Sequence, residues 1–257
     1  MVKTDYLIVG CGLYGAVLAE RISNILRKKV IIIDRRNHIA GNCYSLKDSS
    51  TGIEYHKYGT HTFHTDHEIV WNYANQFTTF NCYRHQSLAR YKNKIYQLPI
   101  NLETINSFFN KNFNPDQAKR HLEKLTKPYQ KQKGFNFETK ALSQIGKELY
   151  QAFIRNYTIK HWRKDPKKLP STIFNRLPLR FNYSENYQKN CKWNGIPDDG
   201  YTNFVSNILD NKKISIDLNN NFNLVNNKFR VKYFTIYTGP LDRIFNLNRK
   251  EIEKKLK

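Results

Sequence analysis

The chain has 257 residues and a formal net charge of +22, from 43 basic and 21 acidic side chains. This length allows one large domain or two smaller ones, and the apolar runs are only strand-length, so we expect no membrane-spanning helix. The cysteines contain no Cys-x-x-Cys pair, which favours reduced thiols over a disulfide framework or zinc site; they are Cys11, Cys43, Cys82 and Cys191. Residues 1–5 lead directly into the first predicted strand and leave no room for a signal peptide, so we expect a cytoplasmic protein.

Basic residues occur throughout the chain rather than in one stripe, for example at Arg27–Lys29 and Lys164–Lys168, and asparagine is abundant. An AT-rich coding sequence would produce the same bias towards lysine and asparagine. No recognition motif accompanies the charge, so nucleic acid is not an expected partner. A basic surface would still attract an anionic sugar nucleotide.

The first predicted elements are typical of a dinucleotide-binding unit. Tyr6–Val9 is an apolar run that predicts a buried strand, and it leads into Gly10-Cys11-Gly12-Leu13-Tyr14-Gly15 and a segment with helical apolar spacing. Gly10 allows the sharp turn, Gly12 lets the backbone approach a pyrophosphate, and Gly15 lets the helix pack closely on its strand. The phosphates would lie at the positive end of that helix.

A second apolar strand, Val30–Ile33, ends at Asp34, whose carboxylate can accept both hydroxyls of an adenosine ribose. Strand, turn, helix, strand and acid follow in the expected order within about 30 residues. This order favours a dinucleotide site over the alternative, a glycine-rich turn in an ordinary α/β domain. Asp34 would repel a 2′-phosphate, so NADP is not the expected nucleotide.

Two further blocks follow, Arg35–Tyr44 and Tyr55–Thr65, and clustered histidines stand in and just after the second: His56, His61, His64 and His67. A metal site would need a fixed ligand set, and neither a His-x-x-x-His helix pair nor a Cys pair supplies one, so we expect no metal. The alternative is a loop that crosses the face of a flavin. There Gly59 would allow close backbone approach, and His61 would hydrogen-bond the ring system.

Residues 102–169 contain few glycines and show helical apolar spacing, for example at Leu142, Ile145 and Leu149. This pattern predicts a helical insertion between pieces of an α/β domain. Spacing alone predicts that three aromatic residues of this segment, Phe153, Tyr157 and Trp162, belong to the hydrophobic core. Aromatic residues at helical spacing are more often core residues than part of a ligand-binding surface.

Taken together, these blocks resemble the bacterial UDP-galactopyranose mutases. The resemblance is carried by Gly10–Val17, Asp34–Ile39 and His56–Thr65. It covers nearly the whole chain up to about Asn246, because further matches follow in order at Leu98–Leu102, Gly146–Tyr150, Asn156–Trp162, Arg176–Phe181, Asn186-Tyr187, Gly195–Pro197, Gly200–Thr202 and Tyr237–Asp242.

The resemblance implies that FAD is the cofactor and that its reduced form is active. It implies a cofactor site formed by Gly10, Gly12, Tyr14, Gly15, Asp34, Arg35, Asn42, His61, Thr62, Asn221, Phe222 and Gly239. His61, lying over the flavin, would tune the protonation and orientation of the ring system.

The resemblance also implies that UDP-galactopyranose and UDP-galactofuranose are the substrates. The implied substrate site contains His85, Phe153, Tyr157, Thr158, Trp162, Arg176 and Tyr187. For Tyr157 and Trp162, the resemblance replaces the prediction of core residues: it implies that they hold uracil and ribose. Arg176 would pair with the diphosphate through its forked guanidinium. For His85, in a predicted strand before Ser87, and for Tyr187, an ordinary exposed strand residue remains an alternative.

The implied chemistry moves no net electrons. N5 of the reduced flavin would attack the anomeric carbon and displace UDP, the sugar would open and reclose through its 4-hydroxyl, and UDP would return. The protein would hold the diphosphate with Arg176, aim the sugar and exclude water. The galactofuranose would supply a surface polysaccharide such as lipopolysaccharide.

The chain also departs from the family pattern. Arg163 and Ala40 stand where the family has glycine, Gln188 replaces an aromatic residue, and Asp198-Asp199-Gly200 replaces a more neutral turn. The family continues well beyond Phe245, where this chain has a charged tail over 246–257. We therefore expect little mutase activity from the chain alone. Two rival functions are a flavin oxidoreductase of the amine-oxidase type and a non-catalytic nucleotide-binding remnant.

The expected fold is α/β. A Rossmann-type FAD-binding domain covers residues 1–80 and is rejoined by 197–245, and a helical substrate domain covers 102–175. Substrate-face strands in 81–101 and 176–196 would form a small antiparallel sheet. No membrane partner is expected, and the sequence leaves a homodimer open.

Overall fold

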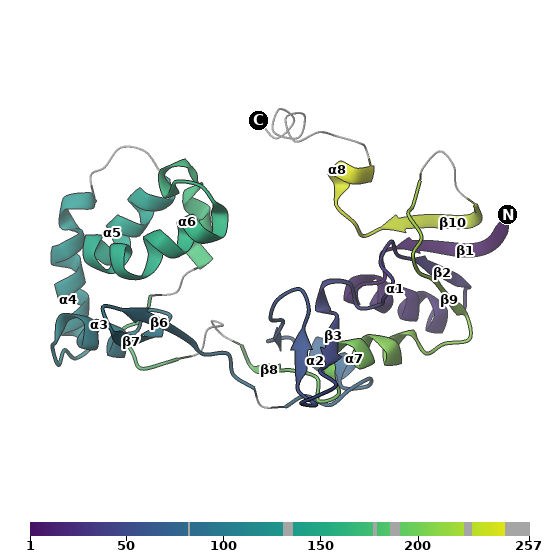
Figure 1. The fold of residues 1–257 in the computed structure, drawn as a ribbon, viewed down its shortest axis with the longest axis horizontal. Helices are drawn as coiled ribbons and strands as arrows, with labels where there is room; N and C mark the ends of the chain where they lie inside the picture. The colour runs from purple at the N-terminus through teal and green to yellow at the C-terminus, as the bar shows by residue number, and fades with distance from the viewer. Residues whose placement is uncertain (82, 131–135, 177–178, 186–190, 224–227, 245–257) are drawn as a thin grey trace. The chain divides into compact units, whose positions relative to one another are not determined.

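The computed structural model describes residues 1–81, 83–130, 136–176, 179–185, 191–223 and 228–244 (Figure 1). The chain divides into two compact units. Unit 1 contains residues 1–83 and 192–257, and unit 2 contains residues 84–191. Across the described ranges, no helix combines the length and apolar character needed to cross a bilayer.

Unit 1 is built on a four-stranded parallel sheet with the order β10-β1-β2-β9 (Figure 1). Its strands are β1 (Val2–Val9), β2 (Val30–Ile33), β9 (Ile214–Asp217) and β10 (Phe229–Tyr237). All four residues of β2 are apolar and buried, as expected for an interior strand of a parallel sheet whose two faces are both covered. The strands predicted at 6–9 and 30–33 are confirmed.

One face of this sheet is covered by helices α1 (Leu13–Asn24) and α7 (Gly200–Leu209) (Figure 1). The core between them contains small residues of α1, Ala16 and Ala19, which let the helix lie close to the strands. On the opposite face, Leu7 and Ile33 pack against Phe222 and Tyr237. The predicted α/β class with a Rossmann-type sheet is confirmed.

Short elements complete unit 1. Two antiparallel pairs join β3 (Ser45–Lys47) to β4 (Glu54–His56) and β5 (Phe63–Thr65) to β8 (Trp193–Gly195). A 3-10 turn occupies Gly41–Cys43, and the remaining helices are α2 (Glu68–Ala74) and α8 (Leu241–Ile244). The β5–β8 pair joins one segment that precedes unit 2 in the sequence to one that follows it.

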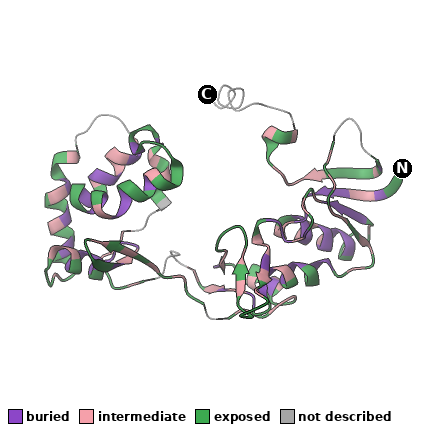
Figure 2. Ribbon diagram, in the orientation of Figure 1, coloured by how far each residue is buried: buried purple, intermediate pink, exposed green. Residues whose placement is uncertain are grey.

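Unit 2 combines the hairpin of β6 (Ser87–Tyr91) and β7 (Lys94–Leu98) with helices α3 (Leu102–Phe109), α4 (Pro115–Thr126), α5 (Phe137–Leu149) and α6 (Asn156–Trp162). A π-helical turn (Tyr150–Arg155) joins α5 to α6, and 3-10 turns occupy Lys127–Tyr129, Pro166–Lys168 and Ser171–Arg176. Buried residues line the inward side of α5 (Figure 2). The predicted helical insertion is confirmed, and Leu142, Ile145 and Leu149 lie in its core.

Asparagine begins three of these helices. The side chains of Asn101, Asn114 and Asn136 accept hydrogen bonds from the backbone N–H three residues later, and the residue at that position bonds back in each case. Such reciprocal caps satisfy two otherwise unpaired N–H groups at each helix start. Part of the asparagine bias of the composition therefore has a structural use.

Two details of the predicted strand segments differ. His85 lies in irregular chain two residues before β6, so the strand predicted at His85 is wrong. Among the described residues of 176–196, the strand is β8, and it belongs to unit 1 rather than to the substrate unit.

Candidate nucleotide-binding sites

The glycine turn of unit 1 is shaped by close backbone packing. Gly10 has φ +115°, and a side chain on it would collide with Thr238, whose hydroxyl donates to the Val9 carbonyl at 2.9 Å. A side chain on Gly15 would collide with the carbonyl oxygen of Gly10. Gly12 is the N-cap of α1, so the unpaired N–H groups of the first helical turn begin directly after it. The turn has the form that a pyrophosphate requires.

Asp34 lies at the carboxyl end of β2, beside this turn. Its Oδ2 accepts the Cys11 N–H at 2.8 Å, and its Oδ1 accepts the Arg36 N–H at 2.9 Å. These bonds fix the carboxylate where a ribose next to the pyrophosphate would present its hydroxyls. The backbone of Asn219 and Asn220 pairs with the carbonyls of Arg36 and Asp34, which holds the segment leading to Asn221 and Phe222 nearby.

Arg36, which sequence reasoning did not select, faces the same turn. Its Nη2 donates to Asn42 Oδ1 at 2.7 Å, and the guanidinium carbon lies 4.6 Å from the centre of the Tyr58 ring. A Cβ on Gly41 would lie 2.8 Å from the Gly12 Cα and 3.6 Å from Arg36 Nη1. The guanidinium therefore adjoins the point where two glycines bring the backbone segments together.

The selected neighbour, Arg35, is exposed. The chain bends directly after Asp34, and in this bend the Arg36 N–H donates back to Asp34 Oδ1. The strand pattern ends at Ile33, so no periodic signal in the sequence distinguishes Arg36 from Arg35.

The other predicted cofactor residues are spread more widely over unit 1. Tyr14 is 68% exposed in the first turn of α1. Phe222 packs near Tyr237, with ring centres 6.3 Å apart, and Asn221 beside it is exposed. Gly239 follows Thr238 in the strand-to-helix connection after β10. The structure thus gathers Gly10, Gly12, Gly15, Asp34 and Asn42, and places Tyr14 on the outer surface of α1.

The histidine segment forms a hydrogen-bonded turn. The His61 N–H donates to His56 Nδ1 at 3.0 Å, and His61 Nδ1 lies 2.8 Å from the Gly59 carbonyl oxygen. Gly59 has φ +106°, and no atom among the described residues lies within 4 Å of the position of a Cβ added there. Gly59 is therefore required for its backbone conformation within the described structure. Thr62 follows His61 and is half-buried, and His64 is exposed.

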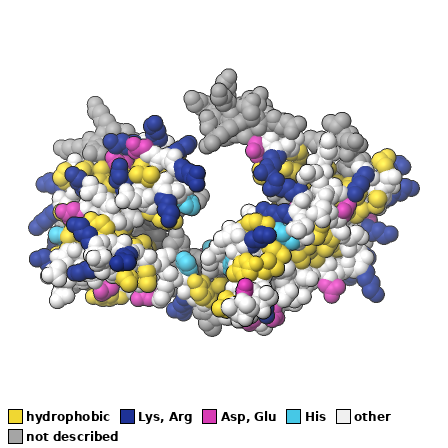
Figure 3. Space-filling view, viewed as in Figure 1, with side chains coloured by type: hydrophobic (Ala, Val, Ile, Leu, Met, Phe, Trp, Pro, Cys, Tyr) yellow, Lys and Arg dark blue, Asp and Glu magenta, His cyan; other side chains and the backbone are white. Residues whose placement is uncertain are grey.

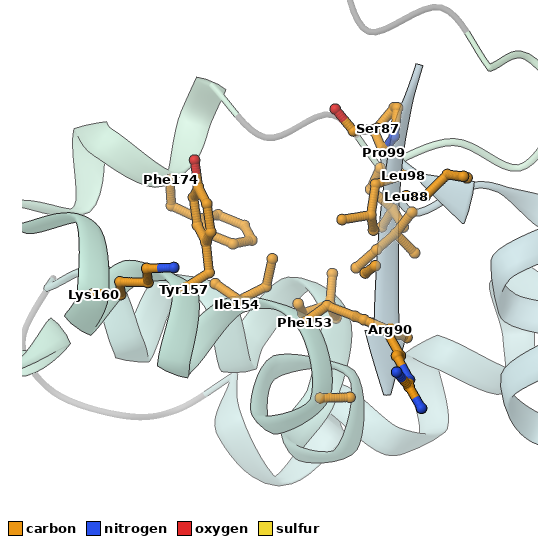
Figure 4. Close-up of a pocket in the computed structure, with 15 residues that line it drawn as sticks. Ser87, Leu88, Arg90, Leu98, Pro99, Phe153, Ile154, Tyr157, Lys160 and Phe174 are labelled. Atoms are coloured by element: carbon orange, nitrogen blue, oxygen red, sulfur yellow. The ribbon is translucent and has the colours of Figure 1, made fainter. Parts of the chain in front are cut away.

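Unit 2 contains a cavity of about 630 Å³ whose walls are largely apolar (Figure 4). In this view Leu88, Leu98 and Pro99 form one side, while Tyr157 and Lys160 lie across from them. Phe153 and Ile154 lie at the base. An apolar slot with a few polar groups is typical of a site for a planar, partly polar ligand such as a nucleobase.

Two of the predicted substrate residues, Phe153 and Tyr157, line this cavity. Thr158 is 3% exposed and does not line it, and Trp162 is 43% exposed at the end of α6, edge-on to His161. His85 Nε2 lies 3.2 Å from the hydroxyl of Ser87, which does line the cavity.

Arg176 ends a 3-10 turn whose Phe174 lines the cavity. The Arg176 side chain and all of Tyr187 lie outside the described residues. Sequence reasoning missed Lys160, although a position three residues after Tyr157 on a helix lies on the same face.

Basic side chains are spread over the visible face of both units and do not gather in one stripe (Figure 3). At the cavity they include Lys160 and Arg90, the latter donating to Asn93 Oδ1 at 3.1 Å. The positive field expected from the composition is therefore general, with Lys160 as a local cation on the cavity wall.

Two family models match parts of this chain. A family model described as UDP-galactopyranose mutase matches residues 152–255, and one described as an NAD(P)-binding Rossmann-like domain matches residues 8–77. A probable UDP-galactopyranose mutase of Klebsiella pneumoniae is 42% identical over 96% of this chain and 63% of the relative. A dTDP-fucopyranose mutase of Escherichia coli is 41% identical over 84% of this chain and 57% of the relative. The chain thus spans about three fifths of the length of these relatives.

Solved structures show the same fold at low sequence identity. A crystal structure of reduced UDP-galactopyranose mutase has a TM-score of 0.59 and 16% identity, covering 83% of this chain and 48% of that one. An oxidoreductase from Methanosarcina mazei has a TM-score of 0.50 and 15% identity, covering 85% and 51%. Together with the glycine turn, these likenesses indicate a dinucleotide-binding fold.

Proposed function

We propose that this chain, which is 42% identical to a probable UDP-galactopyranose mutase over 96% of its length, is a nucleotide-sugar mutase that works with reduced FAD and acts on UDP-galactopyranose and UDP-galactofuranose. One observation carries the proposal. A single chain combines a dinucleotide turn, with Asp34 and Arg36 beside it, and a cavity lined by Phe153 and Tyr157 in the segment that matches the mutase family model.

The residues of unit 1 fit an FAD molecule. The glycine turn leaves space for a pyrophosphate against the start of α1, Asp34 offers its carboxylate to the ribose, and the Arg36 guanidinium can pair with phosphate oxygens. The His61 turn would lie against the ring system. When bound and reduced, the flavin would supply the nucleophile for the anomeric carbon of the sugar.

The residues of unit 2 fit a pyrimidine nucleotide. Tyr157 offers an exposed ring on which a nucleobase can stack, and Phe153 lies at the bottom of the cavity. Lys160 on the wall, and Arg176 by its family position, would bind the anionic part. Holding the diphosphate this way orients the sugar and excludes water from it.

A second substrate pair, dTDP-fucopyranose and its furanose form, is favoured by the 41% identical Escherichia coli relative. The apolar lining of the cavity is compatible with a 5-methyl group on the base. Competition between UDP and dTDP, followed by calorimetry, separates the two: tighter binding of dTDP would assign the second pair.

A flavin titration tests the first part of the proposal. We expect the purified chain to bind FAD, with flavin absorbance that is retained through desalting and released on denaturation. A protein that stays colourless after reconstitution with FAD and binds NAD instead would contradict the proposal.

UDP binding tests the second part and separates the mutase from an amine-oxidase-type oxidoreductase, which needs no UDP site. Loss of a charge-assisted contact costs about 1.5–3 kcal/mol. We therefore expect Arg176→Ala to weaken UDP binding roughly 10- to 150-fold, with Arg176→Lys restoring it only in part because lysine lacks the fork. Unchanged affinity in Arg176→Ala would show that Arg176 does not bind the diphosphate.

Conversion of UDP-galactofuranose under dithionite tests whether the chain alone completes the reaction. Turnover equal to that of the Klebsiella pneumoniae relative would contradict the expectation of low activity. UDP binding without turnover in the reduced protein supports a nucleotide-binding remnant. Cytoplasmic location stays a prediction from the sequence, which leaves a homodimer open.

A further inference from the structure

Three elements of unit 1 meet around His56. The residue ends β4 and pairs with Ser45 of β3. Thr202 of α7 donates its hydroxyl to the Ser45 carbonyl at 2.7 Å and accepts the Ser45 N–H at 3.0 Å. The β3–β4 pair is therefore clamped to the start of α7, and the backbone of His56 is held by that clamp.

The imidazole of His56 is held as well. The buried ring of Tyr201, the second residue of α7, meets His56 edge-on with ring centres 5.5 Å apart, and meets His61 at 6.3 Å. His56 Nδ1 accepts the backbone N–H of His61 at 3.0 Å. An acceptor nitrogen carries no proton, so this geometry requires unprotonated Nδ1 in His56.

The same turn sets the tautomer of His61. A carbonyl oxygen only accepts, so the contact of 2.8 Å between His61 Nδ1 and the Gly59 carbonyl requires a proton on Nδ1. In the neutral imidazole, Nε2 then carries the lone pair. The ring of His61 thus presents an acceptor as long as the turn holds.

We propose that His56 is a positioning residue, which as a neutral imidazole holds the Gly59–His61 turn and thereby fixes the nitrogen that His61 presents. Its meaning for catalysis rests on the proposed function, because His61 is the residue expected against the flavin. The contact itself belongs to the chain's own residues and exists without flavin or sugar.

The charges around His56 set the pH range in which the contact persists. Burial lowers the pKa of His56, Glu54 on the same strand acts in the opposite direction, and His61 lowers the pKa further. Lys57 follows in the chain, and Tyr201 and Cys43 lie on the neighbouring elements. As pH falls through this lowered pKa, Nδ1 takes a proton, and two N–H groups then oppose each other. The turn should hold at neutral pH and be released in acid.

Amide hydrogen exchange at His61, measured by NMR on the full chain without ligand, tests the proposal. We expect protection of the His61 amide at pH 7.5 that declines only once the pH has fallen below 6.5, the ordinary pKa of histidine. His56→Phe keeps a ring against Tyr201 but removes the acceptor, and should lower the protection factor roughly threefold or more. His56→Asn places an amide oxygen near the position that Nδ1 of His56 occupies. This variant should keep the His61 amide protected, with no dependence on pH. His67→Phe, at an exposed histidine before α2, should match the wild type.

Unchanged protection in a folded His56→Phe protein would overturn the proposal, as would an NMR spectrum showing His61 with its proton on Nε2. If His56→Phe does not fold, His56→Asn decides: protection that still follows pH would mean that another group holds the turn. Failure of the proposed function leaves these results untouched, since it would appear as absent FAD or UDP binding with the His61 turn intact.

Discussion

At the scale of single residues, Arg35 and Arg36 show what a motif can and cannot specify. The resemblance pointed to Arg35, and the structure turns Arg36 towards Asn42 and the glycine turn. The glycines and Asp34 were predictable because each is required by backbone conformation or by position at a strand end. The choice between adjacent arginines depends on the path of the chain after β2.

This choice gives a matched pair of variants. We expect Arg36→Gln to weaken FAD binding roughly 10- to 150-fold, because a charge-assisted contact to phosphate contributes about 1.5–3 kcal/mol. Arg35→Gln changes the net charge equally and should alter the affinity less than threefold. Titration followed by quenching of flavin fluorescence measures both. The reverse order of effects would return the role to Arg35.

At the scale of elements, the sequence predicted the strands and helices well and their ends less well. Helical spacing identified the buried face of α5 but not the break within it at Gly146, where φ is +75° and an added Cβ would lie 3.3 Å from the Leu125 Cβ. The strand predicted at His85 was wrong because the ladder of β6 begins only at Ser87, opposite Leu98, the last residue of β7. Such features arise from tertiary contacts that local pattern does not contain.

One departure from the family pattern lies at the end of α6. Arg163 occupies the left-handed conformation, with φ +48° and ψ +35°, where the family has glycine. An L-residue pays about 1–2 kcal/mol for this conformation, while glycine adds about 0.5–1 kcal/mol of unfolded-state entropy. Ala40 shows the same feature, with φ +68°.

We therefore expect Arg163→Gly to raise the free energy of unfolding by about 0.5–1 kcal/mol. Arg163→Ala removes the same charge but keeps the strained conformation, so it should give no gain. Urea denaturation followed by circular dichroism measures both. Equal stabilisation by glycine and alanine would show that the charge, and not the backbone, determines the effect.

At the scale of the whole molecule, each unit carries one of the two candidate sites. Unit 1 carries the dinucleotide turn, and unit 2 carries the cavity with Phe153 and Tyr157. The fold class and the turn were predictable because they depend on short, ordered motifs. The cavity was not predictable from spacing alone, because an aromatic residue that lines a cavity and one that belongs to the core occur at the same helical spacing. Only the resemblance indicated that Tyr157 binds substrate. Lys160 and the apolar wall formed by the β6–β7 hairpin were identified as parts of the cavity only in the structure.

The central claim is that the cavity of unit 2 binds a pyrimidine nucleotide, and calorimetric titration of UDP into the full chain tests it most directly. Stacking of a base on an aromatic ring contributes about 1–3 kcal/mol, so we predict that UDP binds and that Tyr157→Ala weakens binding roughly 5- to 150-fold. Tyr183→Ala, at an exposed tyrosine of the same unit outside the cavity, should bind UDP as the wild type does. Absence of UDP binding by the wild type, or equal affinity in Tyr157→Ala and Tyr183→Ala, would contradict the account.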